Sequence, residues 1–101
     1  MSEVVEFTLH VKPGHYDRVL KIEMDFVSSY MDINPNLKSV IVVGDAAQGL
    51  LRAIGTYDTA EHAAAVNSDP VFARFNDQLA PYIVGAADRV RLDLIHAWNR
   101  D

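Results

Sequence analysis

The sequence predicts one α+β domain over residues 1–101, in which helices cover one face of a four-stranded antiparallel sheet. Three observations predict it: two segments that alternate between apolar and polar residues, a β-branched pair of segments around a short turn, and segments with helical periodicity. The chain has the length of a single domain, and half of its residues are apolar. We therefore expect one domain without an internal linker.

The first strand and the first helix have the clearest patterns. Residues 3–12 alternate strictly, with Val5, Phe7 and Leu9 on one side and polar residues between them, which is the period of a strand with one apolar face. After a Lys-Pro-Gly turn, residues 15–31 place their apolar side chains on one broad arc at helical spacing. A strand followed by an amphipathic helix is predicted.

A hairpin and a second helical region follow. Residues 39–43 and 50–57 are rich in β-branched and apolar side chains and are separated by the short connection 46–49, so they predict an antiparallel hairpin. Asp58 is predicted to cap the next helix, because Glu61 three residues later completes a capping-box pattern.

A second helix start and a last strand complete the pattern. Ser68, Asp69 and Pro70 place a capping side chain and a helix-initiating proline before an apolar helix that should stop at Pro81. Residues 89–98 alternate again, and we expect the side with Val90, Leu92, Leu94, His96 and Trp98 to face the helices. The resulting order, βαββαβ, is that of the ferredoxin-like fold.

The sheet face turned away from the helices is predicted to be mixed in polarity. Its expected members are Glu6, Thr8, His10, Arg52, Thr56, Arg91 and Asp93. Either water covers this face, as in many antiparallel sheets, or a second copy of the chain covers it and its charges pair across the joined sheets. Because a domain of this size buries little surface alone, we predict a homodimer through the sheet face.

Composition excludes several classes of partner. The net charge is −5 and no basic run is present, so nucleic acid is not expected as a partner. The longest apolar runs are far shorter than the roughly 20 residues of a membrane span, and the N-terminus has no basic start before an apolar stretch, so no membrane association and a cytoplasmic location are expected. Without cysteine or a His ligand spacing, no metal is expected.

Residues 57–75 carry a resemblance to a known family. They read Y-D-T-A-E-H-A-A-A-V-N-S-D-P-V-F-A-R-F. This segment resembles the antibiotic biosynthesis monooxygenase family, whose members read roughly W-x-S-x-E-A-x-x-x-H-x-x-S-x-x-F-x-x-F. The residues in register are Tyr57, Thr59, Glu61, Phe72 and Phe75. The V-K-P-G-H segment after the first strand is also typical of the family. The resemblance implies a dimeric α/β barrel with a ligand cavity between helices and sheet.

For activity, the resemblance implies several alternatives. The family includes cofactor-independent oxygenases of aromatic compounds, haem-degrading oxygenases and members without an assigned reaction. The haem-degrading branch carries an Asn on the first strand, and a Trp and an iron-binding His on the second helix. The aligned residues here are Phe7, Val66 and Asn76. We therefore expect no haem and no other cofactor.

Two residues are candidates for catalysis. Glu23 lies near the middle of the apolar arc of the first helix, where desolvation should raise the pKa of its carboxyl and allow it to act as a general base. The structural alternative is that Glu23 hydrogen-bonds a tyrosine or the sheet edge. His96, on the expected helix-facing side of the last strand, could orient a substrate or share a proton with Glu23; the alternative is a core histidine.

The expected lining of the cavity combines aromatic and polar side chains. Its candidate substrate-binding residues are Phe7, Tyr16, Tyr30, Tyr57, Phe72, Asn76 and Trp98. The predicted function is that of a cofactor-independent monooxygenase acting on a small aromatic or enolic compound. The alternative is a non-catalytic dimeric module that binds a small apolar ligand. Convergence of Glu23 and His96 on an open cavity would favour the enzyme.

Overall fold

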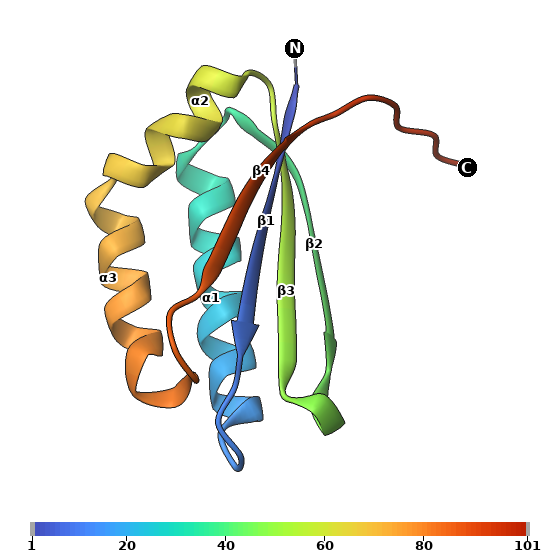
Figure 1. Ribbon diagram of the computed structural model, residues 1–101. Coiled ribbons are helices and arrows are strands. Elements are labelled where there is room, and N and C mark those ends of the chain that lie inside the picture. Colours follow the sequence, from blue (N-terminus) through green and yellow to red (C-terminus); the bar gives the residue numbers. More distant parts are fainter. Residues whose placement is uncertain (1, 101) are drawn as a thin grey trace.

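The helices and strands follow one another in the predicted order (Figure 1). The computed structural model describes residues 2–100. Its strands are β1 (Glu3–His10), β2 (Leu37–Asp45), β3 (Leu50–Tyr57) and β4 (Asp88–Asp93). Its α-helices are α1 (Tyr16–Ile33), α2 (Ala60–Ala65) and α3 (Pro70–Leu79), and its short 3₁₀ helices are η1 (Ala46–Gln48), η2 (Val66–Ser68) and η3 (Ala80–Tyr82).

The four strands form one antiparallel sheet in the order β2-β3-β1-β4. Figure 1 shows the helices together on one side of this sheet, so the molecule has two layers. The first strand of the chain is therefore central, with β3 on one side and β4 on the other. This arrangement confirms the predicted ferredoxin-like α+β fold.

The alternation in β1 and the apolar arc of α1 determine how the two layers meet. Val5, Phe7 and Leu9 are buried towards the helices, while the residues between them are less buried. In α1 the buried side chains are Val19, Glu23 and Tyr30, which share one face of the helix. The predicted amphipathic strand and helix are therefore confirmed, and a carboxyl group lies within the buried face.

Side-chain caps start the two later helices. Thr59 accepts a hydrogen bond from the His62 backbone N–H at 3.1 Å and begins α2. Asp69 accepts from the Val71 N–H at 3.0 Å and begins α3, with proline as its first residue, as predicted. The prediction that Asp58 caps α2 is wrong by one residue: Asp58 accepts from the Thr59 N–H, and its Oδ1 lies 2.7 Å from His62 Nδ1.

The core consists of two clusters of buried apolar side chains between sheet and helices. One cluster contains Phe7, Leu9, Val11, Val19, Leu51, Phe75, Leu79 and Ile83. The other contains Val5, Tyr30, Leu37, Tyr57, Ala63 and Val66. Phe26 of α1 and Phe72 of α3 are half-buried and pack against both clusters. The two clusters meet where these phenylalanines lie.

Strand β4 differs from the prediction in its length and in its facing. It ends at Asp93, and Arg91 lies opposite Val5 of β1, on the side that faces the helices. Arg91 Nε lies 3.4 Å from Glu3 Oε1, and Asp93 pairs with Glu3 in the strand register. The prediction that Arg91 and Asp93 face outwards is therefore wrong. Val90 is apolar, which favours its side of β4 as the core side, but it lies opposite Glu6 on the outer face.

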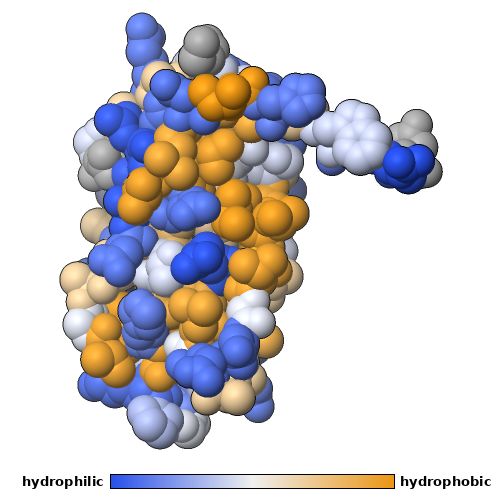
Figure 2. Space-filling view, turned by 45° about the vertical axis from the view of Figure 1, so that its right-hand side comes forward, coloured by the Kyte–Doolittle hydropathy of each residue, from blue (hydrophilic) through white to orange (hydrophobic). Residues whose placement is uncertain are grey.

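The outer face of the sheet is richer in apolar side chains than predicted. Glu6, Thr8, His10, Arg52 and Thr56 lie on it as expected, since they alternate with the buried residues of β1 and β3. The same face carries Ile41, Val43, Ile54, Val90 and Leu92. Figure 2 turns this side of the molecule towards the viewer and shows orange apolar side chains gathered beside polar ones. The face is therefore mixed in polarity, as predicted, but with a larger apolar share than the sequence indicated.

Replacing Gly44 by alanine should destabilise the β2–β3 hairpin. The Tyr16 hydroxyl donates a hydrogen bond to the Leu50 carbonyl oxygen at 3.0 Å, and an added Cβ at Gly44 would meet that hydroxyl and would lie 2.8 Å from the same carbonyl oxygen. We expect the free energy of unfolding, measured by urea denaturation, to fall by about 1–2 kcal/mol as this bond is displaced. In a Tyr16→Phe background the same substitution should cost less; an equal cost in both backgrounds would show that the hydroxyl is not the obstacle.

Candidate functional site

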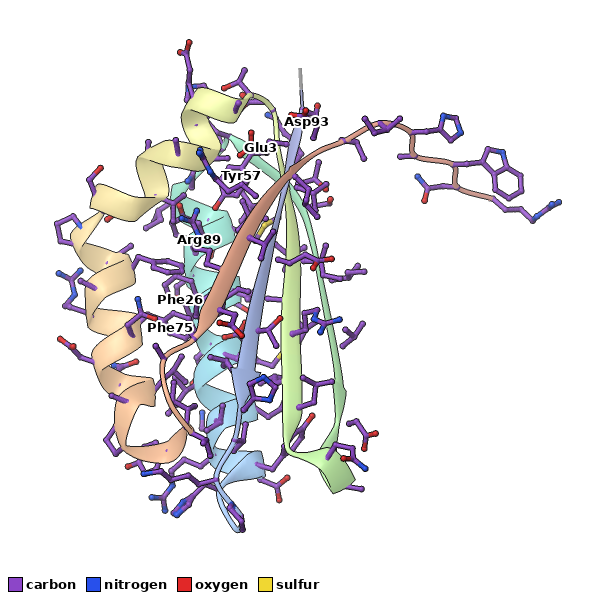
Figure 3. All side chains as sticks on the ribbon, in the orientation of Figure 1. Glu3, Phe26, Tyr57, Phe75, Arg89 and Asp93 are labelled. Atoms are coloured by element: carbon purple, nitrogen blue, oxygen red, sulfur yellow. The ribbon has the colours of Figure 1, made fainter. Side chains whose placement is uncertain are left out.

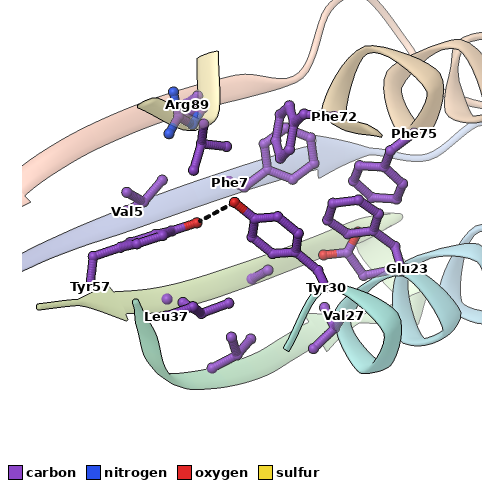
Figure 4. Close-up of a pocket in the computed structure, with 15 residues that line it drawn as sticks. Val5, Phe7, Glu23, Val27, Tyr30, Leu37, Tyr57, Phe72, Phe75 and Arg89 are labelled. Atoms are coloured by element: carbon purple, nitrogen blue, oxygen red, sulfur yellow. Dashed lines mark hydrogen bonds between the residues drawn. The ribbon is translucent and has the colours of Figure 1, made fainter. Parts of the chain in front are cut away.

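A cavity lies between the sheet and the helices, where the two core clusters meet (Figure 4). Its volume is about 60 Å³. Strands β1, β2, β3 and β4 supply one wall, and α1, η2 and α3 supply the other. The lining side chains are almost all apolar or aromatic, and the exceptions are Glu23, Arg89 and the hydroxyls of two tyrosines.

Glu23 places a carboxyl group in the wall of this cavity. Its side chain is only 1% exposed, and it lies on the same face of α1 as Phe26, Val27 and Tyr30, one or two turns further along. Glu23 Oε2 is buried without a hydrogen-bond partner among residues 2–100. Burial disfavours the charged form and raises the pKa of Glu23 to about 7. At neutral pH this carboxyl can therefore both accept and release a proton.

Stacked aromatic rings form the wall beside Glu23. The rings of Phe26 and Phe75 are parallel within 12°, with centroids 3.9 Å apart, and Tyr30 continues the stack from Phe26 at 5.3 Å. Phe72 meets Phe7 edge-on at 5.4 Å. Such faces and edges suit a flat aromatic ligand, because offset and edge-to-face ring contacts are favourable.

Two tyrosine hydroxyls meet at the end of the cavity near β3 (Figure 4). Tyr57 donates to the Tyr30 hydroxyl over 3.5 Å, a long and weak hydrogen bond, while Asn34 Nδ2 donates to the same oxygen at 2.7 Å. Burial, and then the contact with Tyr30, raise the pKa of Tyr57 above its ordinary value, so it stays protonated. Since the Tyr30 oxygen accepts twice, its own proton can be donated to another acceptor.

Arg89 brings a positive charge to the cavity from β4, as Figure 3 shows. One of its terminal nitrogens donates to the Ala63 carbonyl oxygen at 3.0 Å, and its guanidinium lies 5.6 Å from the centre of the Phe72 ring. Desolvation is the main cause that lowers the pKa of Arg89, which nevertheless stays charged. Sequence reasoning missed this residue because it took the opposite side of β4 as the helix-facing side.

Five of the predicted site residues line the cavity: Phe7, Glu23, Tyr30, Tyr57 and Phe72. The position of each follows from strand alternation or helical spacing, both of which the sequence shows directly. Sequence reasoning missed the lining role of Phe26 and Phe75. Their helical spacing from Tyr30 and from Phe72 was the available signal.

Four predicted site residues lie elsewhere. Tyr16 hydrogen-bonds Leu50 at the β2–β3 hairpin, and Asn76 is exposed on α3, where it lines a neighbouring groove. His96 and Trp98 lie in the extended segment after β4, where both are exposed, and Trp98 is 70% exposed. The prediction that His96 faces the helices from the last strand is wrong, because β4 ends at Asp93. Glu23 and His96 do not converge.

The part of the chain that the structure describes shows neither a metal-binding cluster nor a membrane-spanning helix. Residues 2–100 contain no group of three or more His, Asp or Glu side chains placed to hold a metal ion. No helix within this range is both long enough and apolar enough to span a membrane.

The fold and the cavity together define the class: a ferredoxin-like α+β domain with an internal, mainly aromatic cavity and one buried carboxyl group in its wall. The sequence matches no protein-family model and no curated protein sequence. Solved structures, in contrast, match it over nearly its whole length.

Three solved structures illustrate the likeness. One from Caulobacter crescentus, described as a "putative antibiotic biosynthesis monooxygenase", is 17% identical with a TM-score of 0.82, over 94% of this chain and 91% of that chain. A structure from Deinococcus radiodurans with the same description is 13% identical with a TM-score of 0.81, over 98% of each chain. A dimeric ferredoxin-like protein from Jannaschia sp. is 12% identical with a TM-score of 0.75, over 93% of this chain and 100% of that chain.

These likenesses confirm, at the level of the fold, the resemblance to the antibiotic biosynthesis monooxygenase family that the sequence indicated. At such identities they show the shared fold alone, because one fold hosts many functions. The chemistry of this chain therefore depends on the side chains of its own cavity.

Glu23→Gln should change how stability depends on pH. A carboxyl with a pKa of 4.5 when unfolded and about 7 when folded destabilises the fold progressively as pH rises from 4.5 to 7, and the penalty is constant above that range. The gap in unfolding free energy between variant and wild type should widen in favour of the variant by about 3 kcal/mol from pH 4 to pH 8. Urea denaturation at matched protein concentration measures it; a gap that narrows as pH rises would mean that Glu23 is held as a paired carboxylate.

Proposed function

We propose that this protein is a cofactor-independent monooxygenase of small aromatic or enolic compounds, with Glu23 as its general base. The observation that carries the proposal is the burial of the Glu23 carboxyl in an aromatic cavity, with Oε2 unbonded within the described chain and with a pKa of about 7. A general base works best when its pKa lies near the working pH. A buried carboxyl without a partner is costly, and such groups are concentrated at functional sites.

The reaction needs little from the protein beyond deprotonation. The Glu23 carboxylate takes a proton from an acidic hydroxyl or carbon of the substrate, and the resulting electron-rich anion reduces dioxygen. One oxygen atom is bonded to the substrate carbon, and the other leaves as water with two hydrogens from the substrate, one of them returned by Glu23. The substrate thus loses two hydrogens and gains one oxygen atom. No further reductant is required.

The remaining polar groups suit the charge that develops. The Tyr30 hydroxyl, which accepts from Asn34 and Tyr57, has its proton left for a substrate oxygen. Arg89 adds a positive charge on the β4 side of the cavity. Hydrogen-bond donors and charges fixed in a dry site stabilise a developing anion more strongly than water does. Tyr57 stays protonated, so it donates a hydrogen bond to Tyr30 and does not act as a base.

The alternative is a non-catalytic module that binds a small apolar ligand. The aromatic walls of the cavity fit that function equally well. The position of Glu23 favours the enzyme, because an apolar binding pocket gains nothing from a carboxyl whose desolvation is unfavourable.

Oxygen consumption with a panel of phenols and hydroquinones tests the proposal. For any compound that is turned over, Glu23→Gln should lower kcat by roughly 10²- to 10⁴-fold, because the amide keeps the shape but cannot accept the proton. Exposed Glu61 at the start of α2 provides the matched control, and Glu61→Gln should retain the wild-type rate. Compounds that bind without any oxygen uptake, or full turnover in Glu23→Gln, would contradict the proposal.

We further propose that a second copy of the chain covers the outer face of the sheet. Half-exposed apolar side chains lie there, Ile41 and Val43 on β2 and Val90 and Leu92 on β4, with the partly buried Ile54 of β3 between them, and an exposed apolar patch on a small domain favours association. The similar Jannaschia structure is described as a dimeric ferredoxin-like protein. Arg52 and Thr8, joined by a 3.0 Å hydrogen bond, would add polar contacts to this interface.

Light scattering should give a mass of twice 11.2 kDa for the wild-type chain at micromolar concentration. Ile41→Lys should shift the mass to that of one chain, because it buries an unpaired charge in the interface. Met24→Lys is the matched control: Met24 is 45% exposed on α1, and Ile41 is 58% exposed on the sheet. Retention of the dimer by both variants would place the interface elsewhere.

A further inference from the structure

A second, larger hollow adjoins the cavity on its β4 side. This groove has a volume of about 490 Å³ and lies between α3 and the chain that leads into β4. It shares three lining residues with the inner cavity, namely Phe7, Phe72 and Arg89. These three side chains therefore lie between the two spaces.

The size of the inner cavity requires such an extension. An engineered apolar cavity of roughly 150 Å³ binds a single benzene ring, and pockets for drug-sized ligands span about 300–1,000 Å³. The inner cavity measures about 60 Å³. A ligand that reaches Glu23 must therefore displace one of the enclosing side chains and extend beyond them, and the groove is the adjoining space.

We propose that the α3–β4 groove is a second subsite of the same binding site, and that the ligand is an aromatic compound of at least two rings with an anionic or acidic oxygen placed at Arg89. The proposal rests on the proposed function for the ring that enters the inner cavity. The groove holds the rest of the ligand, and Phe72 is the side chain that moves to join the two spaces.

The contacts of Phe72 fit a movable partition. Phe72 lies in the first turn of α3 and is half-buried, so its ring is less tightly enclosed than that of the buried Phe75. It is edge-on to Phe7 at 5.4 Å and to Phe26 at 5.7 Å, and the Arg89 guanidinium lies 5.6 Å from its centre. A flat ligand ring can replace each of these contacts with one of its own.

The charges along the groove favour an anionic group at its inner end. Arg89 is half-buried and fixed by its hydrogen bond to Ala63 O, and Asp77 and Asn76 line the groove further along α3. A charged hydrogen bond to a partly desolvated guanidinium is stronger than one in water. Asn76, which does not line the inner cavity, would contact the part of the ligand that lies in the groove.

Binding of two fluorescent probes tests the proposal. 1-Anilinonaphthalene-8-sulfonate carries aromatic rings and one anion, and N-phenyl-1-naphthylamine has the same hydrocarbon frame without the charge. Ala73 is exposed and lines the groove, and Ala60 is exposed at the start of α2 and lines none of the hollows described for this protein. Ala73→Glu should weaken binding of the sulfonate probe by about tenfold or more through bulk and repulsion, whereas Ala60→Glu, which changes the net charge equally, should alter it less than about twofold.

A second pair of variants tests the role of the charge. Arg89→Met should weaken the sulfonate probe by about tenfold while changing the neutral probe by less than about twofold. Arg74→Met, at an exposed arginine on α3 outside the groove, should change neither. Circular dichroism checks that each variant is folded. Equal binding of the sulfonate probe to the Ala73 and Ala60 variants, or equal weakening of both probes by Arg89→Met, would overturn the subsite.

The outcome is separable from that of the proposed function, because probe binding requires no turnover. If Glu23→Gln abolishes oxygen uptake but Ala73→Glu and Arg89→Met leave probe affinity unchanged, the groove is not a subsite and the role of Glu23 stands. Probe binding that depends on both groove residues, together with full turnover in Glu23→Gln, would overturn the role of Glu23 and support the groove.

Discussion

The stacked rings of Phe26 and Phe75 hold the two long helices together over the central strand. Phe26 belongs to α1 and Phe75 to α3, and their centroids are 3.9 Å apart with planes inclined by 12°. Phe75 also packs against Phe7 of β1 at 5.7 Å. Because the helices are joined through these large, flat rings, the space on either side of the stack need not close completely. The cavity that Glu23 lines lies beside this stack.

The Glu23 carboxyl is the unfavourable element that this packing leaves in place. A leucine of similar size would suit the same position on α1 and would bury more apolar surface. The chain instead carries an acid whose pKa is raised to about 7, which limits the penalty because the group is largely neutral below that pH. Stability and function thus compete at this residue: the environment that disfavours its charge also gives it the pKa of a useful base.

The two faces of β4 explain why part of the site was missed. Val90 and Leu92 are apolar but lie on the outer face, while Arg89 and Arg91 face the helices. Strand alternation separates two sets of side chains but does not say which set meets the helices of the same chain. The usual choice, that apolar residues face the core, fails when the outer face is itself apolar. For that reason the sequence did not identify Arg89 as a cavity residue. His96 and Trp98 were predicted to lie in the last strand, but that strand ends at Asp93.

The sequence by itself determined the order of elements, the orientation of β1 and α1, the start of α3 and the presence of a carboxyl in the buried arc of α1. These features depend on residues close together in the chain, through alternation, helical spacing and capping. Only the tertiary structure decided the end and facing of β4, the entry of Arg89 into the cavity and the separation of His96 from Glu23. Those features depend on pairing β4 with β1, about 80 residues earlier in the sequence, and local patterns carry no information about the register of so distant a contact.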